Sequence, residues 1–224
     1  MEEKGTRGHP RVRPKDASAI MVLDRSAGDI RVLVGKRSGR HAFMPDLYVF
    51  PGGRRDSVDN RLTPLRDYHP ETFRMLRSSL REDNAARLRG LGICALRELF
   101  EETGLLDAGV SMNADLSALR YVARAITPPG AVRRYDTHFF ACYCDEIGLS
   151  PDQFGDSNEL SDVHFVPLTG DPSIKMPRIT TMILGELHSF VTIEPSLRYG
   201  NAVPWYFNRR GQHVRVMIAE SETR

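Results

Sequence analysis

The chain has neither a long apolar run nor a strong net charge. No stretch of its 224 residues approaches the roughly 18 consecutive apolar residues that a membrane-spanning helix needs. Its 31 basic and 29 acidic side chains leave a net charge of only +2. There is therefore no overall field that would draw the protein to nucleic acid or to a membrane surface, and we expect neither as a partner.

Cysteine is also scarce. Cys94, Cys142 and Cys144 are odd in number and lack the Cys-x-x-Cys spacing that is typical of many zinc and redox sites. Cys142 and Cys144 would share one face of a strand, because side chains alternate along a strand. The first residues also lack the apolar core of a signal peptide. We interpret the cysteines as reduced structural residues and expect a cytoplasmic protein.

The length of the chain fits one domain. Residues 1–17 are polar and basic, which predicts a flexible N-terminal arm before a single domain over residues 18–224. Alternating and β-branched apolar residues predict strands, and apolar residues at helical spacing predict helices. The predicted strands are 19–23, 30–34, 48–50, 119–126, 137–143, 163–166 and 214–218; the predicted helices are 70–80, 178–189 and one that ends near 104. This order indicates a layered α+β fold.

The most informative stretch is Leu-Arg-Glu-Leu-Phe-Glu-Glu-Thr-Gly-Leu-Leu at 96–106, which has the pattern of the last turns of a helix. Glu98, Glu101 and Glu102 fall at positions i, i+3 and i+4, so their carboxylates share one face. These like charges repel one another, and the helix C-terminus disfavours them further. Arg97 can pair with Glu101 but cannot neutralise all three, whereas a divalent cation would. The alternative is an ordinary solvated face with intrahelical ion pairs.

The residues upstream favour the metal site over the solvated face. Residues 48–53, Tyr-Val-Phe-Pro-Gly-Gly, predict a short strand that runs into a double-glycine turn. A strand, a glycine turn and then Arg-Glu-Leu-Phe-Glu-Glu-Thr-Gly-Leu at 97–105 resemble the Nudix box of the Nudix hydrolases. The resemblance implies a Nudix α/β/α sandwich with a mixed sheet. It also implies hydrolysis of a nucleoside diphosphate linked to another moiety, with Mg²⁺ or Mn²⁺ as cofactor.

The box departs from the family pattern in one respect. The family places a glycine and a glutamate at fixed distances before the arginine, but those positions hold Asp83 and Arg89 here. An insertion over about 56–90 repairs the pattern, with Asp56 or Asp59 in place of the displaced glutamate. We predict that Gly53 lies beside the acidic helix while the insertion loops away. The insertion could form a lid, a partner interface or a simple surface excursion.

The split box resembles one branch of the family, which includes a peroxisomal coenzyme A diphosphatase and many bacterial relatives. Further resemblances lie at 43–46, 127–130, 133–137 and 177–180, and the likeness covers residues 20–189. It implies coenzyme A or acyl-CoA as substrate. The alternatives are ADP-ribose, NADH, dinucleoside polyphosphates and damaged nucleotides. A non-catalytic, nucleotide-binding regulatory domain is a contrasting hypothesis, against which the complete glutamate set argues.

The resemblance also implies roles for the acidic residues. Glu98 and Glu102 are the best candidates for metal ligands. Glu101 is a further ligand or the base that activates water, and Arg97 orients the glutamates. Glu159 precedes a predicted strand at a position where family members often carry another acid, so it is a candidate to complete the metal site. We therefore predict Glu101, Arg97 and Glu98 as catalytic residues.

Binding of the diphosphate is predicted for a second group of residues. The amides of Gly52 and Gly53 could face the diphosphate, although a tight turn alone would also explain the two glycines. Arg37 lies near this turn in the sequence, and Arg133 and Arg134 follow a loop that contains prolines. Their planar guanidinium groups suit phosphate oxygens, but solvated surface arginines are the alternative. We expect a nucleotide diphosphate as the partner and allow for a homodimer.

Overall fold

A mixed sheet forms the centre of the computed structural model, which describes residues 12–38, 46–106, 109, 112 and 114–218. Its strand order is β3-β2-β1-β6-β5-β8-β9, and β4 and β7 pair with β1 and β2 outside this path. The strands are β1 (Lys15–Asp24), β2 (Arg31–Arg37), β3 (Tyr48–Val49), β4 (Gly52–Arg54), β5 (Arg120–Ile126), β6 (Tyr135–Tyr143), β7 (Leu160–Pro167), β8 (Val203–Arg209) and β9 (Gln212–Ile218). The described helices are α1 (Pro70–Leu80), α2 (Ala85–Glu102) and α3 (Arg178–Ile193).

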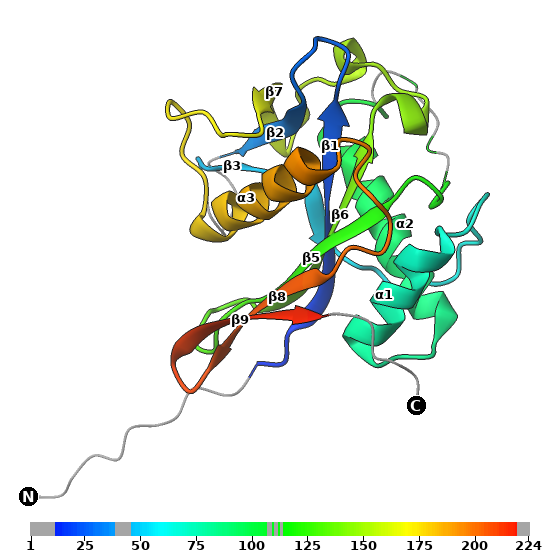
Figure 1. The fold of residues 1–224 in the computed structure, drawn as a ribbon, viewed down its shortest axis with the longest axis vertical. Coiled ribbons are helices and arrows are strands. Elements are labelled where there is room, and N and C mark those ends of the chain that lie inside the picture. The colour runs from blue at the N-terminus through cyan, green and yellow to red at the C-terminus, as the bar shows by residue number, and fades with distance from the viewer. Residues whose placement is uncertain (1–11, 39–45, 107–108, 110–111, 113, 219–224) are drawn as a thin grey trace, which may run out of the picture.

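Helices cover both faces of the sheet, with α1 and α2 on one side and α3 on the other (Figure 1). The alternation of side chains along β1 feeds both layers. Ile20 and Val22 belong to the core that includes the apolar residues of α1 and α2. Met21 and Leu23 belong to the core that packs against α3. The predicted α/β/α sandwich with a mixed sheet is confirmed.

The first strand starts earlier than the sequence indicated. Residues 15–17 were expected in the N-terminal arm, but β1 begins at Lys15 and runs parallel to β6 from Tyr135 onward. Pairing with a strand more than a hundred residues away stabilises this polar segment, and local sequence does not reveal such a partner. Residues 1–11 of the expected arm lie outside the described part of the chain.

The insertion does not loop away as a whole, so that part of the prediction is wrong. Met75 and Leu76 of α1 are fully buried in the same core as Leu88 and Leu91 of α2. The helix that carries the acidic face also starts inside the insertion, at Ala85, after an N-cap by the side chain of Asn84. Burial of an apolar face against the sheet makes the insertion part of the domain core.

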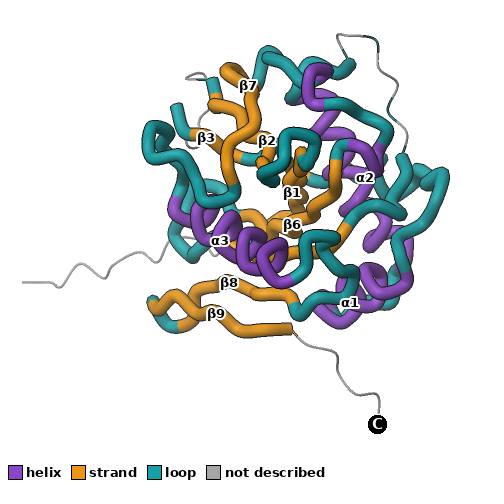
Figure 2. The backbone as a smooth tube through the Cα atoms, turned by 45° about the horizontal axis from the view of Figure 1, so that its top comes forward, coloured by secondary structure: helices purple, strands orange, loops and turns teal. Residues whose placement is uncertain are grey.

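The end of the chain forms a hairpin rather than a single strand. Strand β8 runs parallel to β5, and β9 pairs antiparallel with β8 along its whole length. The hairpin extends the sheet beside α3, as the tube in Figure 2 shows. The aromatic run at 204–207 therefore packs onto the domain, and Tyr206 is buried there. No helix in the described residues is both long enough and apolar enough to cross a bilayer.

Candidate functional site

The carboxylate face of α2 lies directly against β4. A side chain on Gly53 would overlap the carboxyl group of Glu98, and a Cβ on Gly52 would lie only 2.7 Å from the Cα of Ala19 in β1. The backbone of β1 therefore requires a glycine at position 52, whereas a side chain at position 53 would displace the end of the Glu98 side chain. The prediction that Gly53 lies beside the acidic helix is confirmed.

Arg97 connects the acidic face to the start of the insertion. Its Nε donates to Oδ1 of Asp59 at 3.0 Å, and its Nη2 donates to Oδ2 at 3.2 Å. Its Nη1 lies 2.8 Å from carboxylate oxygens of both Glu98 and Glu101. Asp59 is only 1% exposed. A planar guanidinium with bonds on both edges fixes the positions of the three acids around it.

Of the two acids left open by the sequence, Asp59 is the one that meets Arg97. It follows Gly53 by six positions, which is the spacing that the family pattern gives to its glycine and glutamate. Asp56 instead accepts the backbone N–H of Val58 at 3.0 Å, as in a local turn. The amide of Asp56 donates to Oδ2 of Asp59 at 2.7 Å, so the turn also holds the Asp59 carboxylate in place.

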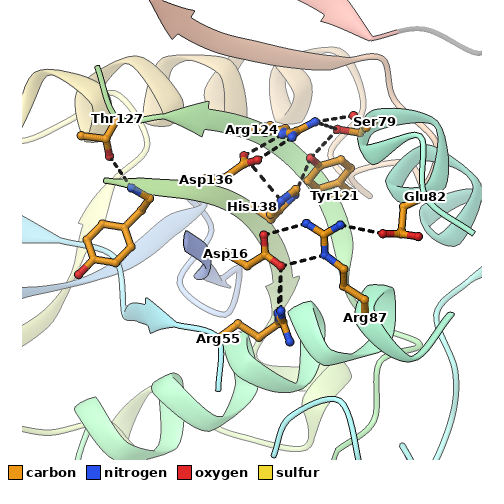
Figure 3. Close-up of polar contacts among 11 residues, drawn as sticks. Asp16, Arg55, Ser79, Glu82, Arg87, Tyr121, Arg124, Thr127, Asp136 and His138 are labelled. Carbon is orange, nitrogen blue, oxygen red and sulfur yellow. Dashed lines mark hydrogen bonds and ion pairs between the residues drawn. The ribbon is translucent and has the colours of Figure 1, made fainter. Parts of the chain in front are cut away.

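A second network fixes α2 and β4 to the sheet (Figure 3). Asp16 of β1 accepts from Nη2 of Arg55 at 3.0 Å, and from Nε and Nη2 of Arg87 at 2.9 Å each. Burial alone would raise the pKa of Asp16, but the bonds and charges of Arg87 and Arg55 outweigh it and lower that pKa. One ionised carboxylate thus joins β1, the segment after β4 and the first turn of α2.

Two of the glutamates on α2 are buried. Glu102 is 3% exposed, and its Oε2 accepts the N–H of Gly52 at 2.8 Å. Burial raises the pKa of Glu102 to about 8, although the Gly52 bond and the charge of Arg37 oppose this shift. Glu98 is 9% exposed, and burial also raises its pKa. The negative charges of Glu98 and Glu159 further raise the pKa of Glu102, whereas the charge of Arg97 partly offsets the shift at Glu98. Glu101 is exposed.

These carboxylates face a cavity of about 480 Å³ that the strands β1, β2, β4 and β6 form with α2. Eight of the predicted site residues besides Arg97 also line it: Arg37, Gly52, Gly53, Glu98, Glu101, Glu102, Arg133 and Glu159. Glu159 directly precedes β7, and Arg37 of β2 donates to the carbonyl oxygen of Gly52 at 3.3 Å. We call this cavity the acidic pocket. Both acids and arginines therefore reach one space, as a site for an anionic substrate and a cation requires.

Two of the predicted binding residues have other partners in this structure. Arg134 is not among the residues that line the acidic pocket; its Nε donates to the carbonyl of Thr127 at 3.0 Å and its Nη1 to that of Val12 at 2.8 Å. Gly52 lines the pocket, but its amide donates to Glu102. Their roles in substrate binding stay predictions. The resemblance noted at 43–46 falls largely on residues 43–45, which lie outside the described part of the chain.

The acidic pocket has the donor chemistry of a magnesium or manganese site. Five carboxylates line it, those of Asp56, Glu98, Glu101, Glu102 and Glu159, and hard divalent cations take carboxylate oxygens. Within the described residues, no three acidic, histidine or cysteine side chains converge into a preformed metal-binding group. The type of ligand therefore fits, and side-chain rotation on α2 would have to complete the site.

Sequence reasoning missed part of the pocket wall. Tyr135, Thr137 and Phe139 of β6 and Ile179 of α3 line the acidic pocket. Alternation along β6 could have placed the first three residues on one face. Nothing in the local pattern shows that this face meets the first turn of α3, because the contact depends on the tertiary fold.

No family model matches the chain. Solved structures do resemble it. A Nudix hydrolase from Alicyclobacillus acidocaldarius is 23% identical with a TM-score of 0.55, and the match covers 78% of this chain and 90% of that one. A MutT/nudix family protein from Enterococcus faecalis is 13% identical with a TM-score of 0.50, and the match covers 84% and 66%. The chain has the fold of the Nudix hydrolases. The comparisons do not separate the coenzyme A branch from other proteins of this fold.

Proposed function

We propose that the protein hydrolyses a diphosphate linkage between a nucleoside and another moiety with the help of Mg²⁺ or Mn²⁺. The observation that carries the proposal is the meeting of Glu98, Glu101 and Glu102 with Arg37 and Arg133 around one cavity in a Nudix fold. A diphosphate is anionic and repels both an attacking hydroxide and the buried acids. A site for it therefore needs cations, and the four arginines that line the pocket do not outnumber its five carboxylates.

The roles of the acids follow from burial and pairing. Glu98 and Glu102 are desolvated carboxylates, and Glu102 has no ion-pair partner among the described residues, which suits them to hold a metal ion. A bound Mg²⁺ supplies charge that neutralises diphosphate oxygens and lowers the pKa of coordinated water. Glu101 is exposed to the pocket and is steered by Arg97, so its carboxylate can accept a proton from the attacking water. Glu159 adds a further carboxylate to the lining of the pocket.

Within this class, coenzyme A or acyl-CoA is the proposed substrate on the strength of the sequence resemblance. Coenzyme A carries a 3′-phosphate beside its adenine, and this phosphate needs a cation separate from the metal. Arg133 is exposed and lines the acidic pocket, which makes it a candidate for that contact. Arg134 is bonded to backbone carbonyls and serves as a matched control.

The proposed function is tested by offering the protein a panel of diphosphates with Mg²⁺ and identifying the products by mass. The panel contains coenzyme A, its 3′-dephospho form, ADP-ribose, NADH and a dinucleoside polyphosphate. Arg133→Ala should reduce cleavage of coenzyme A roughly ten- to a hundredfold more than cleavage of the dephospho form, because a charge-assisted bond contributes about 1.5–3 kcal/mol. Arg134→Ala should not discriminate between them. Binding without turnover of any member would favour the non-catalytic alternative.

A further inference from the structure

A second cavity lies next to the acidic pocket. It has a volume of about 310 Å³ and lies between α3, the ends of β5 and β6, and the β8–β9 hairpin. The two cavities share Tyr135, Thr137, Phe139, Pro177 and Ile179 in their walls. We call the second cavity the apolar pocket. A ligand whose diphosphate occupies the acidic pocket can therefore continue past this shared wall into the apolar pocket.

Apolar side chains dominate the lining of the apolar pocket. They include Ile126, Met182, Phe207 and Val214. No acidic side chain is among its lining residues, and its two basic side chains, Arg178 and His213, are both exposed. Burial of a hydrocarbon chain against this lining is favourable, because each Å² of apolar surface removed from water contributes about 25 cal/mol to the free energy of binding.

Two of its polar groups already have partners. The hydroxyl oxygen of Thr127 accepts the N–H of Tyr135 at 3.1 Å, and the hydroxyl of Tyr206 donates to Glu186 of α3. A nucleobase presents several donors and acceptors on its edges, and each one buried without a partner carries a free-energy cost. The pocket is thus better matched to a hydrocarbon chain than to a base or a sugar.

An ion pair holds the outer wall of the pocket in place. Arg215 of β9 donates to Glu186 through Nε at 2.7 Å and through Nη2 at 2.9 Å. Glu186 lies four positions after Met182 and seven after Ile179, so these three residues share one face of α3. The hairpin is thereby fixed to α3 beside the pocket, which makes the pocket preformed in this structure.

We propose that the apolar pocket binds an uncharged aliphatic chain attached to the diphosphate that is cleaved in the acidic pocket. The proposal rests on the proposed function and narrows its substrate class. The preferred substrates are diphosphates whose second substituent carries an alkyl or acyl chain, which favours acyl-CoA over coenzyme A among the substrates proposed above. Compounds that place a second sugar or nucleotide there, such as ADP-ribose, NADH and dinucleoside polyphosphates, are disfavoured because the largely apolar lining offers few partners for their hydroxyl groups.

A homologous series of ADP esters tests the proposal with the intact protein. Methyl, butyl, hexyl and octyl esters of the β-phosphate share the same scissile diphosphate and differ only in chain length. The kcat/KM should rise about threefold to fourfold for each methylene that enters the pocket, until the pocket is full. Equal kcat/KM across a series that is cleaved would overturn the proposal and leave the proposed function intact.

Binding without cleavage separates the two proposals. The octyl and methyl monoesters of methylenediphosphonate have a P–C–P bridge that cannot be hydrolysed. Trp205 is the only tryptophan of the chain, and its ring centroid lies 4.4 Å from that of Phe207 in the pocket wall. Its fluorescence should therefore change on titration with the octyl compound, which should bind more tightly than the methyl compound. Equal affinities would overturn the proposal even if no ester were cleaved, and absence of all cleavage would contradict the proposed function alone.

A substitution in the wall of the apolar pocket tests whether the aliphatic chain binds there. Met182→Asp places a charge in the pocket and should lower the octyl-to-methyl ratio of kcat/KM, and of affinity, at least about tenfold. Met182→Leu keeps the volume and apolar character and should retain the ratio. An unchanged ratio in folded Met182→Asp would show that the chain binds elsewhere. If Met182→Asp does not fold, Val214→Asp on the opposite wall replaces it. The ester series with the wild-type protein tests the proposal in either case.

Discussion

Arg97 on α2 donates two hydrogen bonds to the buried carboxylate of Asp59, although 38 residues separate them in the sequence. The pair closes the insertion onto the acidic helix. It replaces the short connection that an uninterrupted box would have, and it keeps Arg97 in position between Glu98 and Glu101. The insertion therefore lengthens the chain between two halves of the site without separating them.

Asp59→Asn should weaken both the fold and the site. Removal of the Asp59 charge leaves Arg97 without its buried counter-charge. When both partners of such a pair are buried, the free energy of unfolding falls by up to about 3–5 kcal/mol. Arg97 is partly exposed, so we expect a smaller loss, about 1–3 kcal/mol, in urea unfolding. The kcat of the folded variant should also fall. Asp56→Asn is the control for stability, because Asp56 is exposed and its substitution should leave the free energy of unfolding nearly unchanged. Equal effects of the two substitutions would contradict the role given to Asp59.

Gly53→Ala should damage the site because its new Cβ would overlap the carboxyl group of Glu98. The end of the Glu98 side chain must then shift, which displaces a carboxylate proposed to hold the metal. Turnover should therefore fall more than the melting temperature does. Gly185→Ala is the matched control, since a Cβ there meets nothing within 4 Å inside α3 and should stabilise the helix by about 0.5–1 kcal/mol. Normal turnover in Gly53→Ala would show that turnover does not require the position that the Glu98 carboxylate has here.

Leu76→Ala should destabilise the whole domain, since Leu76 of the insertion is fully buried in the core shared with α2. Removal of a buried leucine side chain costs about 2–5 kcal/mol. Leu65→Ala, also in the insertion, should be nearly neutral because Leu65 is 66% exposed. Urea unfolding measures both. A separate early transition in Leu76→Ala, with the main transition unmoved, would instead mean that the insertion folds as an independent appendage.

His138 should make stability depend on pH. Burial lowers its pKa from 6.5 to about 4, with Arg124 and Arg87 opposing protonation and Asp136 and Asp16 favouring it. The unfolded chain binds the proton more readily, so this contribution is fully present above pH 6.5 and is lost as the pH falls towards 4. Between pH 7 and pH 5 the loss should be about 2 kcal/mol.

The measurement compares urea unfolding of the wild type and of His138→Gln at pH 7 and pH 5. His138 Nδ1 lies 2.9 Å from the hydroxyl oxygen of Tyr121, and a glutamine side chain at position 138 can hydrogen-bond to the same hydroxyl. The free energy of unfolding should change less between the two pH values in the variant than in the wild type, because all other titrating groups are common to both proteins. An identical pH dependence would mean that His138 titrates normally or not at all in this range.

Sequence alone predicted the carboxylate face of α2 better than the residues around it. Helical spacing puts Glu98, Glu101 and Glu102 on one side whatever the tertiary fold, and that face is present. The choice between Asp56 and Asp59 stayed open because it depends on the path of the chain after β4. Arg133 and Arg134 are neighbours with the same chemistry, and only the structure distinguishes the one in the pocket from the one bound to backbone carbonyls.

The fold was also predicted in part, since local sequence determines some of its features and distant partners determine the others. The predicted strands and helices follow from local periodicity, and the α/β/α arrangement follows from their order. The extension of β1 to Lys15 and the burial of Met75 depend on partners distant in the sequence. The apolar pocket could not be foreseen, because its walls come from β5, β6, α3 and the C-terminal hairpin together.

The central claim is that the carboxylates of α2 hold a metal ion for diphosphate cleavage, and Glu102→Gln tests it most directly. Glutamine keeps the shape of the side chain and can still accept the N–H of Gly52, so the fold should remain intact. The measurement is turnover of the best diphosphate substrate together with Mg²⁺ binding by calorimetry, after circular dichroism has verified folding. Because metal stabilisation of transition-state charge amounts to several kcal/mol, turnover should fall about a hundredfold or more and Mg²⁺ affinity should fall with it. Wild-type turnover and Mg²⁺ affinity in a folded Glu102→Gln protein would contradict the claim.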